Sequence, residues 1–324
     1  MMGLKWVAVT ALALAVGCSG GGSQTHTDAS MPDAPPVPGA DWASATTTAA
    51  FGAREGNCAL YFNNAFWVIA GATSGGTPFY DVWTSTDGAS WTAVSAHAAF
   101  TAMKPICIVF DQKMWVLGGT GVWSSTDGVT WTQAVATPPF GYRAGATVAV
   151  FNNAMYLVAG YRSDQGMWVS DVWTSTDGIT WTQATADAGF AARSGHVSLV
   201  YANKLWVLGG EDSHNGALHD VYQSSDGVSW LPATLNAAFG GRANGAGFAF
   251  NNAMWMVGGS SNPVSGVGNS DIWSSTDGAT WTEVTSAAAF PVRVYAGATQ
   301  ASSAMWLIGG QGGAGDLADA WHSL

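Results

Sequence analysis

The sequence predicts an all-β fold, a six-bladed β-propeller with four antiparallel strands in each blade. Three observations carry this prediction. Phenylalanine recurs about every 50 residues, a period typical of four-stranded repeats, at Phe51, Phe100, Phe140, Phe190, Phe239 and Phe290. An apolar run ending in Gly-Gly or Ala-Gly follows each of them. A Thr-Asp-Gly or Ser-Asp-Gly turn and a tryptophan follow five of them.

The composition agrees with this fold class. The chain of 324 residues contains 42 Gly and 18 Trp, and 10% of it is charged, against roughly 25% in typical soluble domains. Many glycines and tryptophans with little Lys or Glu favour short strands and tight turns over helices. The formal net charge is −11, and the ten Lys and Arg are spread along the chain. This argues against a nucleic-acid partner, because phosphate contacts need clustered cations.

The first 40 residues are predicted to direct export. Residues 1–17 contain an apolar run too short to span a bilayer but suited to a signal peptide. The run ends in LAVGCSG, which resembles the lipobox of bacterial lipoproteins. This resemblance implies lipidation of Cys18, and Ser19 after it favours the outer membrane; an ordinary secretory signal is the alternative. Residues 18–40, rich in Gly, Ser and Pro, are expected to form a flexible tether at the cell envelope.

Residues 41–324 are predicted to form the propeller, with four strands in fixed order in each repeat. Strand a is an apolar stretch such as Ala146 to Phe151, and strand b is a run such as Ala253 to Gly259. A variable loop leads to strand c, which begins with Asp-Val-Trp, and the Thr-Asp-Gly turn leads to strand d. The aspartate of that turn can accept backbone N–H bonds and the glycine can adopt φ > 0. We interpret these aspartates as structural: Asp87, Asp127, Asp177, Asp226 and Asp277.

Three aromatic slots recur in every repeat, and they account for 16 of the 18 tryptophans. Strand b carries Trp67, Trp115, Tyr156, Trp206, Trp255 and Trp306. Strand c carries Trp83, Trp123, Trp173, Tyr222, Trp273 and Trp321. Strand d carries Trp42, Trp91, Trp131, Trp181, Trp230 and Trp281. A ring repeated once per blade indicates packing between blades rather than a sugar-binding surface.

The two ends of the repeat array are expected to complete one blade together. A lone strand c lies at residues 319–324, and a lone strand d begins at Trp42. Closing the ring in this way would remove the two free strand edges that an open array exposes.

These motifs resemble the repeats of the Kelch family of β-propellers. The Gly-Gly at the end of strand b, the Asp-Val-Trp or Asp-Ile-Trp of strand c and the tryptophan of strand d carry the resemblance over residues 42–324. The turn S-T-D-G-x-x-W also resembles the Asp-box of sialidase propellers, although it is one residue shorter. Propellers of this kind host both binding proteins and enzymes, so the fold does not decide between them.

Arginine and aspartate recur together in five repeats. The pairs are Arg54 with Asp81, Arg143 with Asp171, Arg193 with Asp220, Arg242 with Asp271, and Arg293 with Asp319. The second repeat has Met103 and Gly121 in the two slots. This joint loss predicts a bidentate ion pair inside each blade. The alternative is a ring of cations at the channel mouth that binds an acidic ligand.

The loops between strands b and c are predicted to bind the ligand, because they vary in length and chemistry while the other turns are uniform. Trp168 lies outside the repeated slots, and with Tyr161 and Arg162 it is suited to stack on a sugar or a partner's side chains. The alternative is that Trp168 covers its own loop. The loop Glu211 to Asp220 adds Glu211, His214 and His219 to the candidate binding residues. It is interpreted as a polar surface loop, with metal binding as the alternative.

Cys58 and Cys107 belong to the strand-a stretches of neighbouring repeats. Their different offsets from Phe62 and Phe110 turn the two side chains to opposite faces of their sheets. In adjacent blades, opposite sheet faces can face each other across the interface. The sequence therefore does not decide between a disulfide and two free thiols.

The function predicted from these observations is a monomeric, non-enzymatic binding module that takes a protein or glycan ligand. No catalytic residue, metal or cofactor is predicted, and the membrane is contacted through the lipid alone. The alternative is a carbohydrate-active enzyme. Resemblance to galactose oxidase would imply two His and a Cys-linked Tyr around copper, and resemblance to sialidases three Arg with a Tyr nucleophile beside an acid; neither set is evident.

Overall fold

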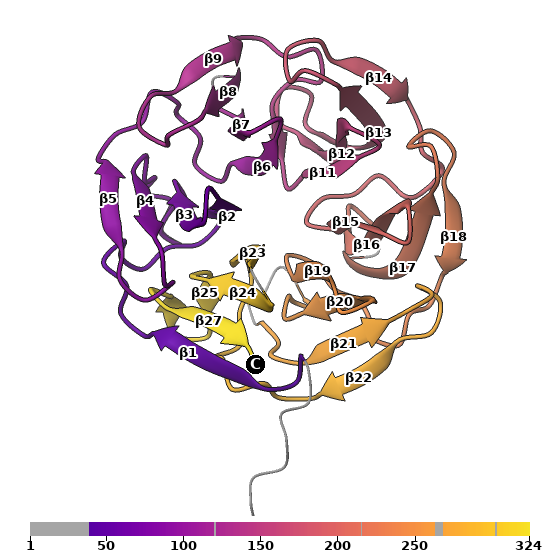
Figure 1. Cartoon of the computed structure of the whole chain (residues 1–324). Helices are drawn as coiled ribbons and strands as arrows, with labels where there is room; N and C mark the ends of the chain where they lie inside the picture. The colour runs from indigo at the N-terminus through magenta and orange to yellow at the C-terminus, as the bar shows by residue number, and fades with distance from the viewer. Residues whose placement is uncertain (1–38, 120, 215, 263–267, 302) are drawn as a thin grey trace, which may run out of the picture. The chain divides into compact units, whose positions relative to one another are not determined.

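A computed structural model describes residues 39–324, except 120, 215, 263–267 and 302. Within these ranges the chain forms strands, turns and loops, and no helix that could cross a membrane is found there. Six sheets, each containing a four-stranded meander, are arranged as blades around a central axis (Figure 1). The predicted six-bladed all-β propeller is therefore confirmed.

Every blade is an antiparallel meander. Blade one contains β2 (Cys58–Phe62), β3 (Ala65–Ile69), β4 (Val82–Ser85) and β5 (Thr92–Ser95). Blade two contains β6 (Ile106–Phe110), β7 (Lys113–Gly118), β8 (Gly121–Ser125) and β9 (Thr132–Val135). Blade three contains β11 (Thr147–Phe151), β12 (Ala154–Arg162), β13 (Met167–Ser175) and β14 (Thr182–Thr185), and β10 (Arg143–Ala144) pairs with β12.

Blade four contains β15 (Val197–Tyr201), β16 (Lys204–Asp212), β17 (Gly216–Ser224) and β18 (Leu231–Thr234). Blade five contains β19 (Ala246–Phe250), β20 (Ala253–Val257), β21 (Ile272–Ser275) and β22 (Thr282–Thr285). Blade six contains β23 (Gly297–Ala301), β24 (Ala304–Ile308), β27 (Ala320–Ser323) and β1 (Trp42–Thr46). A small hairpin of β25 (Gln311–Gly312) and β26 (Gly315–Asp316) lies between β24 and β27.

Blade six is completed by strands from both ends of the ring. The strand β1 pairs antiparallel with β27, and Trp42 lies opposite Ser323 in the register. In Figure 1 the indigo β1 lies beside the yellow β27 on the outer side of this blade. The predicted closure is thus confirmed, and β27 has a partner on both of its sides.

The blades pack on one another through aromatic rings and turn glycines. Each strand-b ring lies against a glycine of the next blade: a Cβ added to Gly128 would come within 2.1 Å of the Trp67 ring, and one added to Gly178 within 2.2 Å of Trp115. Only glycine fits there, because these positions also have φ near +75°. The phenylalanine of each repeat meets the strand-d tryptophan edge-on, as Phe100 meets Trp131 with ring centroids 5.0 Å apart.

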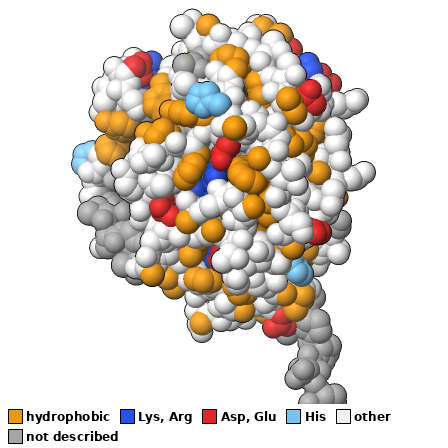
Figure 2. Space-filling model, turned by 90° about the vertical axis from the view of Figure 1, so that its left-hand side faces the viewer, with side chains coloured by type: hydrophobic (Ala, Val, Ile, Leu, Met, Phe, Trp, Pro, Cys, Tyr) orange, Lys and Arg blue, Asp and Glu red, His pale blue; other side chains and the backbone are white. Residues whose placement is uncertain are grey.

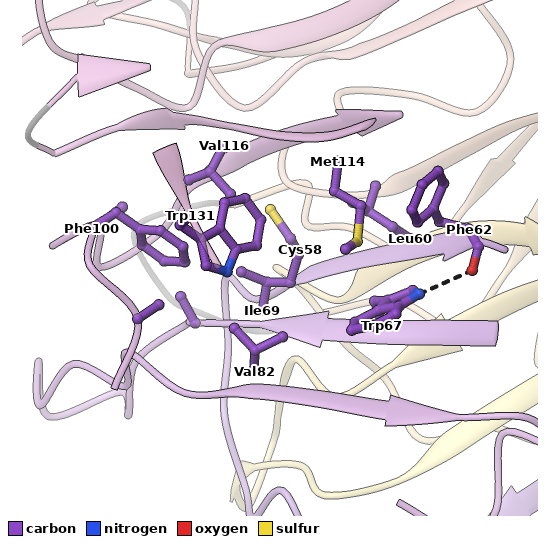
Figure 3. Close-up of a cluster of buried hydrophobic side chains, with 13 residues drawn as sticks. Cys58, Leu60, Phe62, Trp67, Ile69, Val82, Phe100, Met114, Val116 and Trp131 are labelled. Atoms are coloured by element: carbon purple, nitrogen blue, oxygen red, sulfur yellow. Dashed lines mark hydrogen bonds between the residues drawn. The ribbon is translucent and has the colours of Figure 1, made fainter. Parts of the chain in front are cut away.

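Figure 3 shows one of these buried clusters, between blades one and two. Leu60, Ile69 and Val82 of blade one face Met114 and Val116 of blade two across the interface. On the side of the molecule seen in Figure 2, acidic and basic side chains are scattered in small groups among hydrophobic and uncharged ones.

A chain of backbone hydrogen bonds links neighbouring blades at the entrance of the central channel. The N–H of Gly195 donates to Gly145 O at 2.8 Å, that of Asn244 to Gly195 O at 2.7 Å, and that of Tyr295 to Asn244 O at 3.0 Å. The N–H of Gly56 then donates to Tyr295 O at 2.8 Å. These bonds tie blades three, four, five, six and one together in order.

The next link in this chain is chemically impossible, because the corresponding residue of blade two is Pro105, which has no N–H. A disulfide joins the same two blades: Cys58 of β2 is bonded to Cys107 of β6, and their Cα atoms are 5.8 Å apart. The covalent bond thus lies at the junction where the backbone hydrogen bond cannot form.

Candidate functional site

Each of the five Arg–Asp pairs anticipated from the repeats is a buried, bidentate ion pair in the structure. Arg54, for example, donates from both terminal nitrogens to the carboxylate of Asp81 and from Nη1 to the carbonyl of Ala70. The closest nitrogen–oxygen distances in the five pairs are 2.5 to 2.9 Å. The arginine side chains are 0–4% exposed, so their charge is neutralised inside the blades.

The same carboxylate orients the aromatic ring of strand c. The indole N–H of Trp83 donates to Asp81 at 2.7 Å, and the equivalent bonds form in blades three, five and six. In blade two, where Gly121 replaces the aspartate, the indole nitrogen of Trp123 is buried and has no acceptor among the described residues.

The predicted binding residues of blade three lie on the hairpin of β12 and β13. Tyr161 and Trp168 are cross-strand neighbours with ring centroids 4.8 Å apart, and the Trp168 indole donates to Ser194 Oγ at 3.0 Å. Trp168 therefore packs on its own loop and also reaches blade four. Arg162 is paired with Asp164 at 2.6 Å.

Glu211 of blade four joins this group, whereas the two histidines of its loop have other neighbours. Ser194 Oγ donates to Glu211 Oε1 at 3.3 Å, and burial raises the pKa of Glu211. The Nδ1 atom of His214 lies 2.7 Å from Ser213 Oγ, and His219 accepts the N–H of Ala237 on its backbone carbonyl. Within the described residues, no group of three or more His, Cys, Asp or Glu is placed to hold a metal ion.

A cavity of about 310 Å³ occupies the entrance of the central channel, and residues from the start of strand a in all six blades line it. Its polar side chains are Asn57, Lys104, Thr147, His196, Ser198, Asn244 and Tyr295. Concave sites that combine apolar walls with a few convergent polar groups are where small ligands usually bind. We therefore take this channel entrance as the candidate site.

Lys104 connects three blades at the rim of the cavity. Its ammonium lies 2.8 Å from Glu55 Oε1 of blade one and 4.2 Å from the centre of the Tyr295 ring of blade six. The second oxygen of Glu55 is buried and has no hydrogen-bond partner among the described residues.

Tyr295 occupies a backbone conformation that disfavours its side chain. Its φ is +54°, and the equivalent residues are Gly56, Gly145, Gly195 and Asn244, with φ from +58° to +61°. A bulky residue in this region costs about 1–2 kcal/mol relative to an ordinary conformation. Burial, with the charges of Glu211 and Glu55, raises the Tyr295 pKa to about 12, so the phenol stays protonated and can donate a hydrogen bond.

A hydroxyl–imidazole group lines the cavity wall between blades three and four. Thr147 Oγ1 lies 2.7 Å from His196 Nε2 and 2.6 Å from Ser198 Oγ. Burial, reinforced by Arg193, lowers the pKa of His196 to about 3, so the imidazole is neutral at pH 7. Its Nδ1 is buried and lacks a partner among the described residues. The group offers neutral donors and acceptors suited to hydroxyl ligands.

The sequence analysis placed its candidate binding residues, Trp168 and Glu211 among them, on the variable loops and did not predict the channel entrance, whose lining does not include them. Lys104, Tyr295 and His196 come from three blades, and only the closed ring brings them together. One signal existed: Tyr295 stands in a slot that holds glycine or asparagine in four other repeats. Cys18 lies outside the described residues, and Cys58 and Cys107 bond to each other, so neither is available for the Cys-linked tyrosine of a galactose-oxidase-like site.

Comparisons with known proteins address the fold. A search of curated proteins found no match. Among solved structures, one titled "Structure of YjhT" has a TM-score of 0.68 and 15% sequence identity, and covers 86% of this chain and 96% of its own. At that identity the likeness shows the fold alone. The sequence model of the DUF6242 beta propeller domain matches residues 40–159 and 147–274. The chain therefore belongs to the DUF6242 beta propeller domain family.

Proposed function

We propose that the propeller binds a glycan at the channel entrance without transforming it. The strained Tyr295 carries this proposal, because a glycine would fit its backbone and the phenol adds only a ring and a donor at the cavity. Backbone strain persists where the surrounding structure enforces it, and it concentrates at binding sites. Lys104 lies against the phenol ring and pairs with Glu55. The charge of Glu211 also acts on the phenol, and Ser194 connects Glu211 to the Trp168 ring.

This arrangement supports a sugar ligand more than an ionic one. The ammonium of Lys104 is already paired with Glu55, and the five arginines are neutralised inside the blades. Besides Lys104, the polar side chains that line the cavity carry hydroxyl, amide, imidazole and phenol groups, which suit a ligand rich in hydroxyl groups. The enzymatic alternative gains no support from a particular observation at this site.

The binding test uses Tyr295→Gly. Glycine tolerates φ > 0, so the variant is expected to melt within a few degrees of wild type while its binding on a glycan array falls at least about tenfold, the loss expected for a central aromatic contact. Tyr80→Ala, which changes a loop tyrosine outside the cavity lining, serves as the control and should bind like wild type. Equal binding by Tyr295→Gly and wild type would disprove this site.

We further propose that lipidated Cys18 and the following tether hold the propeller at the outer membrane, with the Kelch-like repeats presented to the envelope. The LAVGCSG motif supports this. A Cys18→Ala variant is expected to leave the membrane fraction, because the residue that would carry the lipid is then missing. Fractionation of envelopes with an antibody against the propeller measures this. Identical membrane association of variant and wild type would contradict the anchor.

A further inference from the structure

A second cavity, of about 600 Å³, opens at the outer side of blade two, beside the turn that joins β8 and β9. Its lining comes from β7, β8, β9 and that turn, together with Ile179 of blade three. The turn lies at the strand ends opposite the variable loops, away from the channel entrance. We call this space the Lys113 cavity, after the one basic residue among its lining residues.

Lys113 differs from the other described cations because it has no polar partner. Its ammonium lies 5.8 Å from the centre of the Trp115 ring, and it makes no hydrogen bond or ion pair within the residues that the structure describes. The five buried arginines, Lys104 and Arg162 pair with carboxylates, and Lys204 pairs with an amide oxygen. An unpaired ammonium at a cavity favours an anionic ligand, because charged partners make the stronger hydrogen bonds.

Blade four shows how the fold satisfies a lysine at this place. Lys204 occupies the position equivalent to Lys113, and its ammonium binds Gln223 Oε1 at 2.7 Å. Leu231 lies beside Gln223 in the cross-strand register. Two long side chains therefore occupy the space next to this lysine, and one of them supplies its acceptor.

Blade two has the same register with shorter side chains. Ser124 and Thr132 stand in the places of the glutamine and the leucine, and they are cross-strand neighbours on β8 and β9. Neither reaches as far as its counterpart, and Ser124 lacks the amide oxygen that binds the lysine in blade four. The cavity and the unpaired charge of Lys113 therefore have one cause, which is the presence of short side chains at these two positions.

The other lining residues indicate which kind of anion fits. The hydroxyl groups of Ser124, Thr126 and Thr132 line the cavity, and Ile179, which is 57% exposed, adds an apolar surface. Asp127 also lines it. Its negative charge opposes a doubly charged phosphate more strongly than a singly charged carboxylate. The lining therefore suits a carboxylate whose remaining atoms carry hydroxyl groups and an apolar face.

We propose that the Lys113 cavity binds a singly charged sugar acid, with the carboxylate on Lys113, the ring hydroxyls on the serine and threonine side chains, and the apolar ring face on Ile179. The cavity volume lies within the range of roughly 300–1,000 Å³ that is typical of small-molecule sites. This site is separate from the channel entrance and does not depend on glycan binding there.

The experiment measures the dissociation constants of methyl β-D-glucuronoside and methyl β-D-glucoside for the full chain by saturation-transfer NMR. The two probes differ only in a carboxylate that replaces a hydroxymethyl group, so the difference between them reports recognition of the charge. We expect the glucuronoside to bind at least about tenfold more tightly, the difference expected for a hydrogen bond that involves charged groups.

Two variants and a matched control assign the binding to this cavity. Lys113→Met removes the charge and keeps a long side chain, whereas Ser124→Gln introduces the acceptor and the bulk that blade four has. Each is expected to weaken glucuronoside binding about tenfold while melting close to wild type. Lys204→Met removes the equivalent ammonium of blade four and should bind like wild type.

Three results would overturn the proposal. Equal affinity for the two probes would show that the charge is not recognised. Unchanged glucuronoside binding in Lys113→Met would place the ligand elsewhere. Displacement of the glucuronoside by an equimolar amount of inorganic phosphate would assign the cavity to anions in general. Tyr295→Gly should leave glucuronoside binding unchanged, so failure of the channel-entrance proposal and failure of this one are distinguishable.

Discussion

At the scale of single residues, the buried Arg–Asp pairs matter because each arginine organises several groups at once. Arg193 donates to Asp220, to the carbonyl of Gly209 and to that of Ala191. Removing one partner of such a pair leaves an uncompensated charge in the interior, whereas removing both leaves none. Blade two, with Met103 and Gly121, is a natural example of the double loss.

A double-mutant cycle in blade four tests this reasoning. Arg193→Met alone is expected to lower the free energy of unfolding by about 3 kcal/mol or more, because Asp220 is then buried without a cation. Adding Asp220→Gly should recover part of that loss, so the double variant is more stable than the sum of the single changes implies. Urea denaturation of the four proteins measures the coupling. Strict additivity would show that the two residues do not stabilise each other.

The repeated residues were predictable because each slot recurs in several repeats. The residues of the channel entrance were not predictable in this way. Five Arg–Asp pairs vary together, so their contact follows from the single repeat that lacks both. Lys104 and Glu55 occur once each, and their meeting depends on the side chain of Lys104 lying across Gly56, where an added Cβ would come 2.6 Å from it. The repeat pattern of the sequence does not predict this contact between residues of two different blades.

At the scale of the element, the Thr-Asp-Gly turns and the Ser-Asp-Gly turn of blade four are small hydrogen-bonded units, one in each of five blades. Asp87 Oδ1 accepts the N–H groups of Ala89 and Ser90 at 2.8 Å and the hydroxyl of Ser85 at 2.9 Å. These bonds favour the charged carboxylate and lower the pKa of Asp87 to about 2. The pKa values of Asp127, Asp177, Asp226 and Asp277 are lowered for the same reason.

These turns predict an acid-sensitive propeller. A carboxylate whose pKa is lower in the folded state stabilises the fold above its unfolded pKa, and this contribution is lost as pH falls through the folded pKa. The melting temperature should therefore drop between pH of about 4 and about 2, the range set by the ordinary and shifted pKa of Asp87. Replacing all five aspartates with asparagine should flatten the drop, as calorimetry across this range would show. An unchanged slope would assign the acid sensitivity to other groups.

The junction of blades one and two is the other element whose chemistry differs from its neighbours. Pro105 cannot donate the hydrogen bond that continues the chain around the channel, and the disulfide of Cys58 and Cys107 ties the same blades. The sequence suggested that these cysteines could face each other, but it did not decide between a disulfide and two free thiols. It could not decide, because a disulfide depends on the distance between the Cα atoms, which is a property of the assembled ring.

At the scale of the whole molecule, stability depends on a closure made by noncovalent bonds between β1 and β27. The register joins Trp42 to Ser323 and Ser44 to Trp321, and Trp42 also packs edge-on against Phe290 at 5.0 Å. The closure was predictable from the sequence because five complete c–d hairpins leave one strand c and one strand d over.

Deleting residues 319–324 tests the closure. The deletion removes β27, the partner of β1, together with Asp319, the partner of Arg293. We expect the melting temperature to fall by about 10 °C or more, because the lost strand, its buried contacts and the ion pair amount to several kcal/mol and each kcal/mol is worth roughly 2–4 °C in a chain of this size. Self-association through the exposed edge of β1 should follow, as light scattering would reveal. A monomer with an unchanged melting curve would show that closure contributes nothing.

The position of β1 also determines how the propeller responds to mechanical force. Any tension applied to the chain before residue 39 enters the ring through β1, an outer strand held by a single neighbour. Several contacts resist the pull before that strand peels away. Gly39 is packed under the Trp255 ring, its carbonyl accepts the Trp42 indole N–H at 3.1 Å, and the carbonyl of Asp41 accepts the N–H of Leu324 at 2.9 Å. For a propeller tethered by its N-terminal segment, this short clamp would be the first point to yield under shear, and a ligand pulling on the loop face would strain the closure before it strained any other blade.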